Sequence, residues 1–398
     1  MDISILRAWW AHRQGLDGAY QGKSAAEVLA KTGWARSIGG AAPYLTLFAR
    51  AGLSREAIDQ DVTNGEICEL PSARGCTYVV PAADFALALK VGEGFSTTQD
   101  LKQACKLGAT LAEIDRLCAK VLDALSAGPL DPKELRDHLG GAVREFGPEG
   151  VKKGMATSLP LALGKLQEEG HIRRISTNGR LDQQRYRYIR WLPNPLANFK
   201  LSAEEAQTEL ARRYFSWIGP ATLAEFQWFS ALGVKGAKAA IAPLGLVPLD
   251  EGDERMMFPG DRDLLRAFKV PRKPAYALVA SIDGLSLLRR ALAELLDEKD
   301  LGRKMFTEKG FLPAAGLTCL PSHGIFDRGR LIGLWEYDLP GESVVWSAFV
   351  EPDAALKKSV AGMEEFVRTQ LGDARSFSLD SPKSRVPRVE ALRKAAAR

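Results

Sequence analysis

Three acids from the stretch between residues 59 and 69 are the first candidates for chemistry in this sequence. Asp59 and Asp61 lie close together, and Glu69 stands just before Pro71 and a turn at Arg74-Gly75. A carboxylate can stabilise an oxocarbenium-like sugar and position the water that attacks the anomeric carbon. We therefore take Glu69 as the first catalytic candidate and Asp61 as the second. The alternative is that each acid is only a surface charge or a helix cap.

A pair of glycines marks a second region of interest. The segment from Trp34 to Tyr44 contains Gly39 and Gly40 and joins two expected helices. Glycine permits a positive φ angle and lets another backbone or a ligand come close to the main chain. The pattern therefore fits a loop beside a binding pocket, and it fits a tight helix–helix turn as well.

The densest positive charge lies between residues 171 and 191. Two strand-like runs, rich in arginine and interleaved with tyrosine, flank a turn at Asn178-Gly179. Basic residues neutralise phosphates and release counterions, so we predict contact with the DNA backbone rather than a merely solvated hairpin. The predicted DNA-binding residues are Lys152, Lys153, Lys165, Arg173, Arg174, Arg180, Arg185, Tyr186, Arg187, Tyr188 and Arg190.

Several other kinds of site lack their usual motifs. The five cysteines form no Cys-x-x-Cys pair, and the four histidines share no spacing, so a zinc site is not expected. The signatures of P-loop nucleotide binding, serine hydrolases and zinc proteases are absent from the sequence. We therefore expect an activity that needs no metal and no cofactor.

Length and composition indicate an ordinary globular protein. With 398 residues, 46% of them hydrophobic and 26% charged, the chain suits two to three domains. The net charge of +5 decides little by itself. Apolar stretches are too short for a membrane span, and the first residues lack the features of a signal peptide. We expect a cytoplasmic monomer without membrane contact.

The first two segments of the chain combine helices with strands. Residues 1–125 predict a short strand at 77–80 and helices at 4–14, 25–31, 44–51, 54–64 and 82–90. In residues 126–197 a helix begins with Pro132, a second covers 159–169 and the basic hairpin follows. Helices followed by a hairpin are the layout of a winged helix.

The later segments contain more strands. Residues 198–272 follow an expected linker at Pro193-Asn194-Pro195 and predict helices at 223–232 and 235–244 with short strands at 246–249 and 255–258. Residues 273–398 predict strands at 275–281, 324–326, 331–337 and 343–349, and a basic tail helix. The expected fold class is α+β, mainly helical, with three tandem winged-helix modules and a β-rich C-terminal element.

Several short motifs occur along the chain in a defined order. They are Gln14-Gly15-Leu16, Ala42-Pro43-Tyr44, Leu47-Phe48-Ala49-Arg50, Arg74-Gly75-Cys76-Thr77-Tyr78-Val79-Val80-Pro81, Gly219-Pro220-Ala221-Thr222, Glu225-Phe226, Ser281-Ile282-Asp283 and Arg330-Leu331-Ile332-Gly333-Leu334-Trp335. In this order the chain resembles the AlkZ-like winged-helix DNA glycosylases, which are related to the YcaQ group. The resemblance covers nearly the whole chain.

The resemblance implies winged-helix modules around a DNA channel and removal of damaged bases without metal or cofactor. Members of the family excise alkylated purines and unhook interstrand crosslinks. The family has a Gln-x-Gln or Gln-x-Asp motif where our alignment places Arg36-Ser37-Ile38, and a histidine where this chain has Tyr78. The usual catalytic pair is therefore replaced in this sequence.

Together these observations predict a monofunctional DNA glycosylase that exposes a bulky modified base and leaves an abasic site. The substrate is either damaged DNA in repair or a hypermodified base of phage DNA in defence. The alternative, which the missing glutamines favour, is a non-enzymatic DNA-binding protein or regulator. The predicted substrate pocket contains Trp34, Arg36, Ser37, Gly39, Gly40, Tyr44, Arg74, Tyr78 and Asp283.

Overall fold

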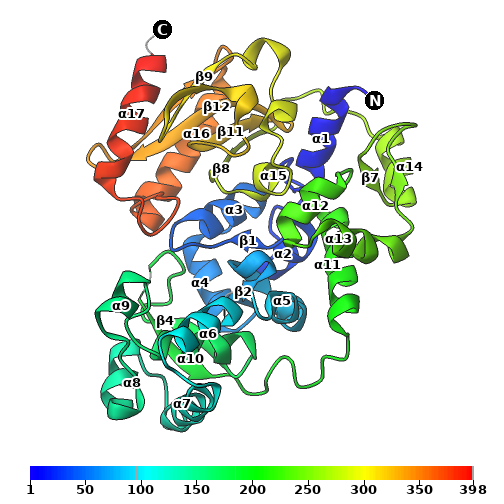
Figure 1. Cartoon of the computed structure of the whole chain (residues 1–398). Coiled ribbons are helices and arrows are strands. Elements are labelled where there is room, and N and C mark those ends of the chain that lie inside the picture. The colour runs from blue at the N-terminus through cyan, green and yellow to red at the C-terminus, as the bar shows by residue number, and fades with distance from the viewer. Residues whose placement is uncertain (96, 184, 397–398) are drawn as a thin grey trace.

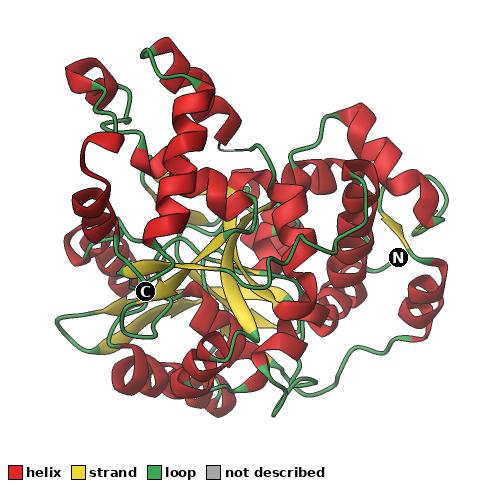
Figure 2. Cartoon of the chain, turned by 90° about the horizontal axis from the view of Figure 1, so that it is seen from below, coloured by secondary structure: helices red, strands yellow, loops and turns green. Residues whose placement is uncertain are grey.

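Helices surround several small antiparallel sheets in a computed structural model of the chain, which describes residues 1–95, 97–183 and 185–396. Figure 2 shows the strands gathered between helices on several sides. The expected α+β class with many helices is therefore confirmed. In this part of the chain no helix is both long enough and apolar enough to cross a membrane.

The first part of the chain is built around a three-stranded antiparallel sheet in the order β1-β3-β2. Its strands are β1 (Ala35–Arg36), β2 (Ile67–Ser72) and β3 (Cys76–Pro81). The surrounding helices are α1 (Ile3–Arg13), α2 (Ala25–Thr32), α3 (Ala42–Ala51), α4 (Arg55–Thr63) and α5 (Phe85–Gly92). These helices and β3 confirm the sequence-based prediction, whereas β1 and β2 were not predicted. Pro71 lies inside β2, and an edge strand tolerates proline because one side of it needs no hydrogen-bond partner.

A second body has its own buried core between residues 104 and 188. It contains α6 (Thr97–Lys106), α7 (Leu111–Ala124), α8 (Pro132–Leu139), α9 (Gly147–Lys152), α10 (Leu159–Glu168), β4 (Ile172–Ser176) and β5 (Tyr186–Arg190). Asp131 caps α8 with a capping box that has Pro132 in the first turn, as the sequence predicts. Residues of α6 and α7 also pack into this core.

The third part is helical and includes a short hairpin. Its elements are α11 (Ala203–Ile218), α12 (Leu223–Ser230), α13 (Val234–Ile241), β6 (Val247–Pro248), β7 (Met256–Met257) and α14 (Pro259–Ala267). The predicted pairing of the two short strands is confirmed. Helix α11 was not predicted, although Ser202 and Glu205 form a capping box at its start.

The C-terminal part contains the predicted β-rich unit. A four-stranded antiparallel sheet has the order β13-β12-β11-β8. Its strands are β8 (Tyr276–Val279), β11 (His323–Asp327), β12 (Arg330–Asp338) and β13 (Ser343–Ala348), and β9 (Lys304–Thr307) pairs separately with β10 (Gly310–Pro313). The helices are α15 (Gly284–Leu287), α16 (Ala354–Phe366) and the tail helix α17 (Pro382–Ala396).

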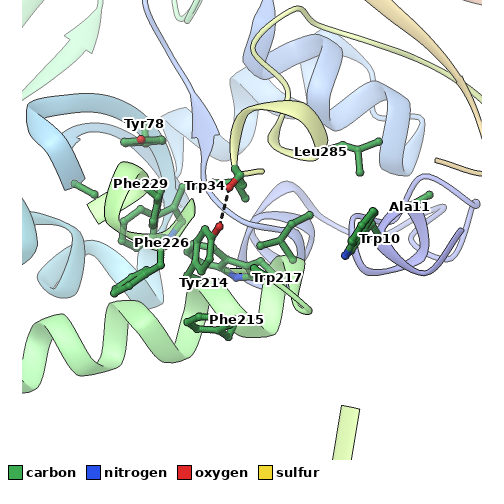
Figure 3. Close-up of a cluster of buried hydrophobic side chains, with 14 of the residues drawn as sticks. Trp10, Ala11, Trp34, Tyr78, Tyr214, Phe215, Trp217, Phe226, Phe229 and Leu285 are labelled. Carbon is green, nitrogen blue, oxygen red and sulfur yellow. Dashed lines mark hydrogen bonds between the residues drawn. The ribbon is translucent and has the colours of Figure 1, made fainter. Parts of the chain in front are cut away.

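The first and last parts of the chain share their buried cores. One cluster extends from α1 through the aromatic residues of α11 and α12 to the C-terminal unit, and Figure 3 shows its central rings. A second cluster joins α2 and α3 to the four-stranded sheet and α16. In Figure 1 the second body accordingly lies at one end of the molecule, while the N- and C-terminal parts interleave. The winged-helix interpretation and the predicted domain limits remain predictions.

Candidate active site

A cavity of about 260 Å³ lies where the first sheet meets the basic hairpin and the C-terminal segment. This volume is close to the lower limit of about 300 Å³ for small-molecule pockets. The wall includes a carboxylate, hydroxyls, guanidinium groups and a phenol. The polar side chains most relevant to chemistry are Ser37, Glu69, Thr77, Arg173, Arg174 and Tyr186.

The register of the first sheet places Ser37 and Glu69 together. Ala35 of β1 and Glu69 of β2 both pair with Val79 of the central strand, from its two sides. Side chains two residues apart share a face of a sheet, so the chain continuing from Ala35 brings Ser37 to the face of Glu69. The Ser37 hydroxyl donates a hydrogen bond of 2.5 Å to the Glu69 carboxylate.

The same alternation corrects part of the predicted pocket. Arg36 pairs with Tyr78, so these side chains lie on the opposite face of the sheet from Glu69. The Arg36 guanidinium lies 5.3 Å from the centre of the Tyr78 ring and donates to the Thr77 carbonyl. Trp34 contacts Tyr78 at a ring distance of 6.1 Å and is buried with it. These three residues therefore belong to the packing behind the sheet.

Two arginines of the hairpin contribute positive charge to the cavity of Glu69. Both Arg173 and Arg174 of β4 line the cavity. Arg174 donates to Gln167 at 2.9 Å, and its guanidinium lies 4.8 Å from the centre of the Tyr186 ring. Burial lowers the pKa of Arg174, but the nearby Glu69 carboxylate and the phenols of Tyr188 and Tyr186 outweigh this and hold the pKa above its ordinary value. The guanidinium and the carboxylate thus stabilise each other inside the cavity.

The thiol of Cys68, which also lines the cavity, is not a reactive group. Burial raises the pKa of Cys68 to about 11, although the charge of Arg173 acts in the opposite direction. At neutral pH Cys68 is therefore protonated and carries no charge. The ionisable chemistry of the cavity is left to Glu69 and the two arginines.

The glycine pair has two separate roles. Gly39 has a φ of +75° and lines the cavity, as expected for a loop beside a pocket. A Cβ atom on Gly40 would lie 2.4 Å from the carbonyl oxygen of Arg375, so Gly40 permits close packing of the C-terminal segment. The second glycine thus admits another stretch of backbone rather than a ligand.

The tip of the basic hairpin is anchored to the protein. Arg180 forms an ion pair with Asp182 and donates to the Leu371 carbonyl at 2.8 Å. The Leu181 amide donates to the Tyr44 hydroxyl at 2.8 Å, and that hydroxyl donates to Asp59. Tyr44 is fully buried, so it holds the hairpin tip in place instead of lining the pocket. Arg180 is likewise engaged internally, in contrast to its predicted role in DNA binding.

The remaining residues predicted to contact DNA differ in how exposed their side chains are. Tyr188 is buried in the core of the second body and is not available to DNA. Exposed ion pairs join Arg187 to Glu134 and Lys153 to Glu149, and Lys165 is paired with Glu169. Such pairs are weak in water, so a phosphate can replace the acid. The residues that are exposed without an ion pair, within the described ranges, are Lys152, Arg185 and Arg190.

Three other candidates are engaged elsewhere. Asp61 accepts a hydrogen bond of 3.2 Å from the Ala25 amide at the start of α2. The positive end of the helix dipole stabilises a negative charge at this position. Asp283 is buried against Arg50 at 2.7 Å. Arg74 projects from the turn after β2, and its guanidinium lies 4.2 Å from the ring centre of Trp228.

Some cavity residues were missed by sequence reasoning. Thr77, Ser176, Gln183 and Ser378 line the cavity but were not candidates. Recognising β2 as a strand would have placed Thr77 on the face of Glu69. Glu69 pairs with Val79 of β3, and Thr77 lies two residues before Val79 on that strand. No pattern in the neighbouring sequence predicts that Ser378 lines the cavity, since this residue lies near the far end of the chain.

We predict that the exposed arginines of the hairpin bind DNA backbone. Because Arg173 lines the cavity, the test uses Arg185→Glu together with Arg190→Glu. Affinity for all duplexes should fall alike, and the slope of log K against log salt should decrease by about 0.9 for each lost phosphate contact. Binding titrations over a salt series measure this. The matched control is Arg266→Glu with Lys269→Glu, two exposed cations at the end of α14. An unchanged slope in the hairpin variant would contradict the prediction.

Comparison with known proteins provides independent support for the fold and family. The profile described as DNA glycosylase AlkZ-like matches residues 30–366. A solved structure of the Streptomyces sahachiroi DNA glycosylase AlkZ is similar to the chain with a TM-score of 0.69 and 18% identity, covering 95% of this chain and 98% of that one. A search of curated proteins found no significant match. The resemblance inferred from the ordered motifs is confirmed, and the chain belongs to the AlkZ-like DNA glycosylase family.

Proposed function

We propose that this protein hydrolyses the N-glycosidic bond of a bulky modified base in double-stranded DNA, with the carboxylate of Glu69 as the catalytic group. The observation that supports this most strongly is the hydrogen-bonded Ser37–Glu69 pair in a cavity that Arg173 and Arg174 also line. A negative group and positive groups thus face one small space. The cleavage of a base from its sugar generates positive charge on the sugar and negative charge on the base.

The proposed reaction uses both kinds of charge. The Glu69 carboxylate first stabilises the oxocarbenium-like sugar that forms as the N-glycosidic bond breaks. Water then adds to the anomeric carbon, and its proton passes to the same carboxylate. The electron pair of the broken bond leaves with the base, where donors from Arg173 and Arg174 stabilise the growing negative charge. Arg36, which the sequence analysis placed in the substrate pocket, is stacked behind the sheet.

The polar lining of the cavity favours this enzyme over a purely DNA-binding protein. A non-enzymatic binder has no need for a carboxylate in the pocket, because DNA repels an acid. Glu69 nevertheless lines the cavity and is hydrogen bonded by Ser37. A closed apolar pocket would have favoured the alternative. The biological setting we propose is either DNA repair or defence against phage DNA that contains hypermodified bases.

The proposal predicts a preference for neutral modified bases over N-alkylated purines. A purine alkylated at N3 or N7 is cationic, so it leaves readily and would be repelled by Arg173 and Arg174 in the cavity. A neutral base needs donors for the charge that develops on it, and these arginines supply them. The test is a competition between duplexes with 7-methylguanine and duplexes with glucosylated hydroxymethylcytosine. Release of 7-methylguanine alone would refute the preference.

The activity itself is tested by incubating the full chain with a panel of modified duplexes and assaying released base and abasic sites. Release should persist in EDTA, because the sequence contains no pattern of metal ligands. The strand should remain intact until the abasic site is cleaved chemically. Borohydride trapping of a protein–DNA adduct, or loss of release in EDTA, would contradict this mechanism. Binding to every duplex without release of any base would favour the regulator.

A further inference from the structure

Two arginines converge on one tryptophan outside the cavity. The guanidinium carbons of Arg74 and Arg290 lie 4.2 Å and 4.4 Å from the ring centre of Trp228 on α12. Arg74 comes from the turn between β2 and β3, and Arg290 follows α15. We refer to these three residues as the Trp228 cluster. It unites three segments that are far apart in the sequence.

The backbone of both arginines is unusual. Arg74 has a φ of +61° and Arg290 a φ of +54°, in the left-handed region that residues other than glycine rarely adopt. Such conformations persist only where the surroundings hold them, and they are frequent at ligand-binding sites. Both arginines therefore reach Trp228 from strained positions in the chain.

The charges of the cluster are not balanced by acids. Arg13 and Arg289 also lie over tryptophan rings, and they pair with Asp261 and with Glu225 and Glu294, respectively. By contrast, among the described residues Arg74 and Arg290 have no carboxylate within ion-pair distance, and Arg290 donates only to the Thr318 hydroxyl at 2.8 Å. The two positive charges that the ring attracts thus lack a negative partner, and a bound anion would supply one.

The position of the cluster relates it to the cavity. The turn that carries Arg74 closes the same β2–β3 hairpin whose strands contribute Glu69 and Thr77 to the cavity. Phe229, next to Trp228, packs against Tyr78 of that hairpin at a ring distance of 6.1 Å (Figure 3). Because Tyr78 faces away from Glu69, α12 packs on the side of the sheet opposite the cavity, and the cluster lies beyond the closed end of the hairpin.

We propose that the Trp228 cluster binds the phosphodiester backbone of the substrate DNA at a point away from the base held at Glu69. This inference rests on the proposed function for the location of the base, but the phosphate contact itself does not depend on base release. Arg74 and Arg290 supply the positive charge, and Trp228 holds the two side chains in a fixed position. The site is separate from the exposed arginines of the β4–β5 hairpin.

The first test measures binding of an unmodified duplex by the double variant Arg74→Ala with Arg290→Ala. The salt slope should decrease by about 0.9 for each lost phosphate, and the variant Arg74→Lys with Arg290→Lys should restore part of it because the charge remains. Arg266→Ala with Lys269→Ala removes the same net charge from α14 and should leave the slope unchanged. An unaltered slope in the first variant, with an unchanged melting temperature, would overturn the proposal.

The second test locates the contact on the DNA. Duplexes with a modified base carry one neutral methylphosphonate at successive positions on either side of it. Binding by the otherwise unaltered protein should weaken when the methylphosphonate replaces the phosphate that the cluster contacts, and the Arg74→Ala, Arg290→Ala variant should be insensitive to that same replacement. Equal sensitivity in both proteins would overturn the proposal. If no duplex releases a base but the salt slope still falls, the proposed function fails while the phosphate contact remains.

Discussion

Replacing Glu69 with glutamine should lower the rate of base release by about 10²- to 10⁴-fold, the range typical for loss of a general acid or base. Glutamine keeps the shape and can still accept the hydrogen bond from Ser37, which is 2.5 Å long in the native protein. It cannot take the proton of the attacking water, and it has no charge to stabilise the sugar cation. The lost interactions exist mainly in the transition state, so the affinity for DNA should hold.

Single-turnover release of base under saturating enzyme measures this effect, and duplex binding is measured in parallel. The matched control is Glu66→Gln, which removes an exposed acid three residues earlier in the same segment. Its rate should equal that of the native protein. Near-normal release by Glu69→Gln would transfer the catalytic role to another acid, with Asp61 as the next candidate. A parallel loss of DNA affinity would instead indicate a structural defect.

The second large effect is expected at Asp283. Its carboxylate accepts two hydrogen bonds from Arg50, at 2.7 Å and 3.0 Å, and a third from the Leu285 amide at 3.0 Å. Both side chains are almost fully buried. The change Asp283→Ala leaves the Arg50 charge without its partner in a medium that solvates charge poorly, so the free energy of unfolding should fall by about 3–5 kcal/mol.

Denaturant unfolding measures this loss as a shift of the midpoint. Glu365→Ala is the control, because Glu365 pairs with Arg368 while both side chains remain about half exposed. An exposed pair of this kind contributes about 0–1 kcal/mol. If the two substitutions shift the midpoint equally, the buried pair is not the stabilising feature that its geometry indicates. Loss of base release without a change in stability would restore Asp283 to the list of pocket residues.

Most of the local structure follows from short stretches of neighbouring residues. Ser24 with Glu27, and Asp131 with Pro132, begin helices at the predicted residues because capping depends only on a few neighbouring residues. The basic hairpin likewise appears where two strand-like runs flank Asn178-Gly179. The ordered motifs also identified the family, since their types and order are properties of the chain itself.

The strands that carry the site were harder to predict. β1 has two residues and β2 contains a proline, so neither shows the alternation of a regular strand. They form because β3 offers hydrogen-bond partners on both of its edges. Without this sheet the sequence does not reveal that Ser37 and Glu69 share a face while Arg36 points the other way.

Which charged residues meet depends on how distant parts of the chain fold together. Arg174 reaches the cavity of Glu69 from more than a hundred positions along the chain, and Ser378 arrives from still farther away. Arg180 and Arg185 look alike in the sequence, but one is held by Asp182 and the other is exposed. The physical reason is that an arginine's role depends on whether an acid, a ring or water surrounds it after folding. Helix caps and turns involve neighbouring residues, whereas the surroundings of a charge are assembled from distant ones.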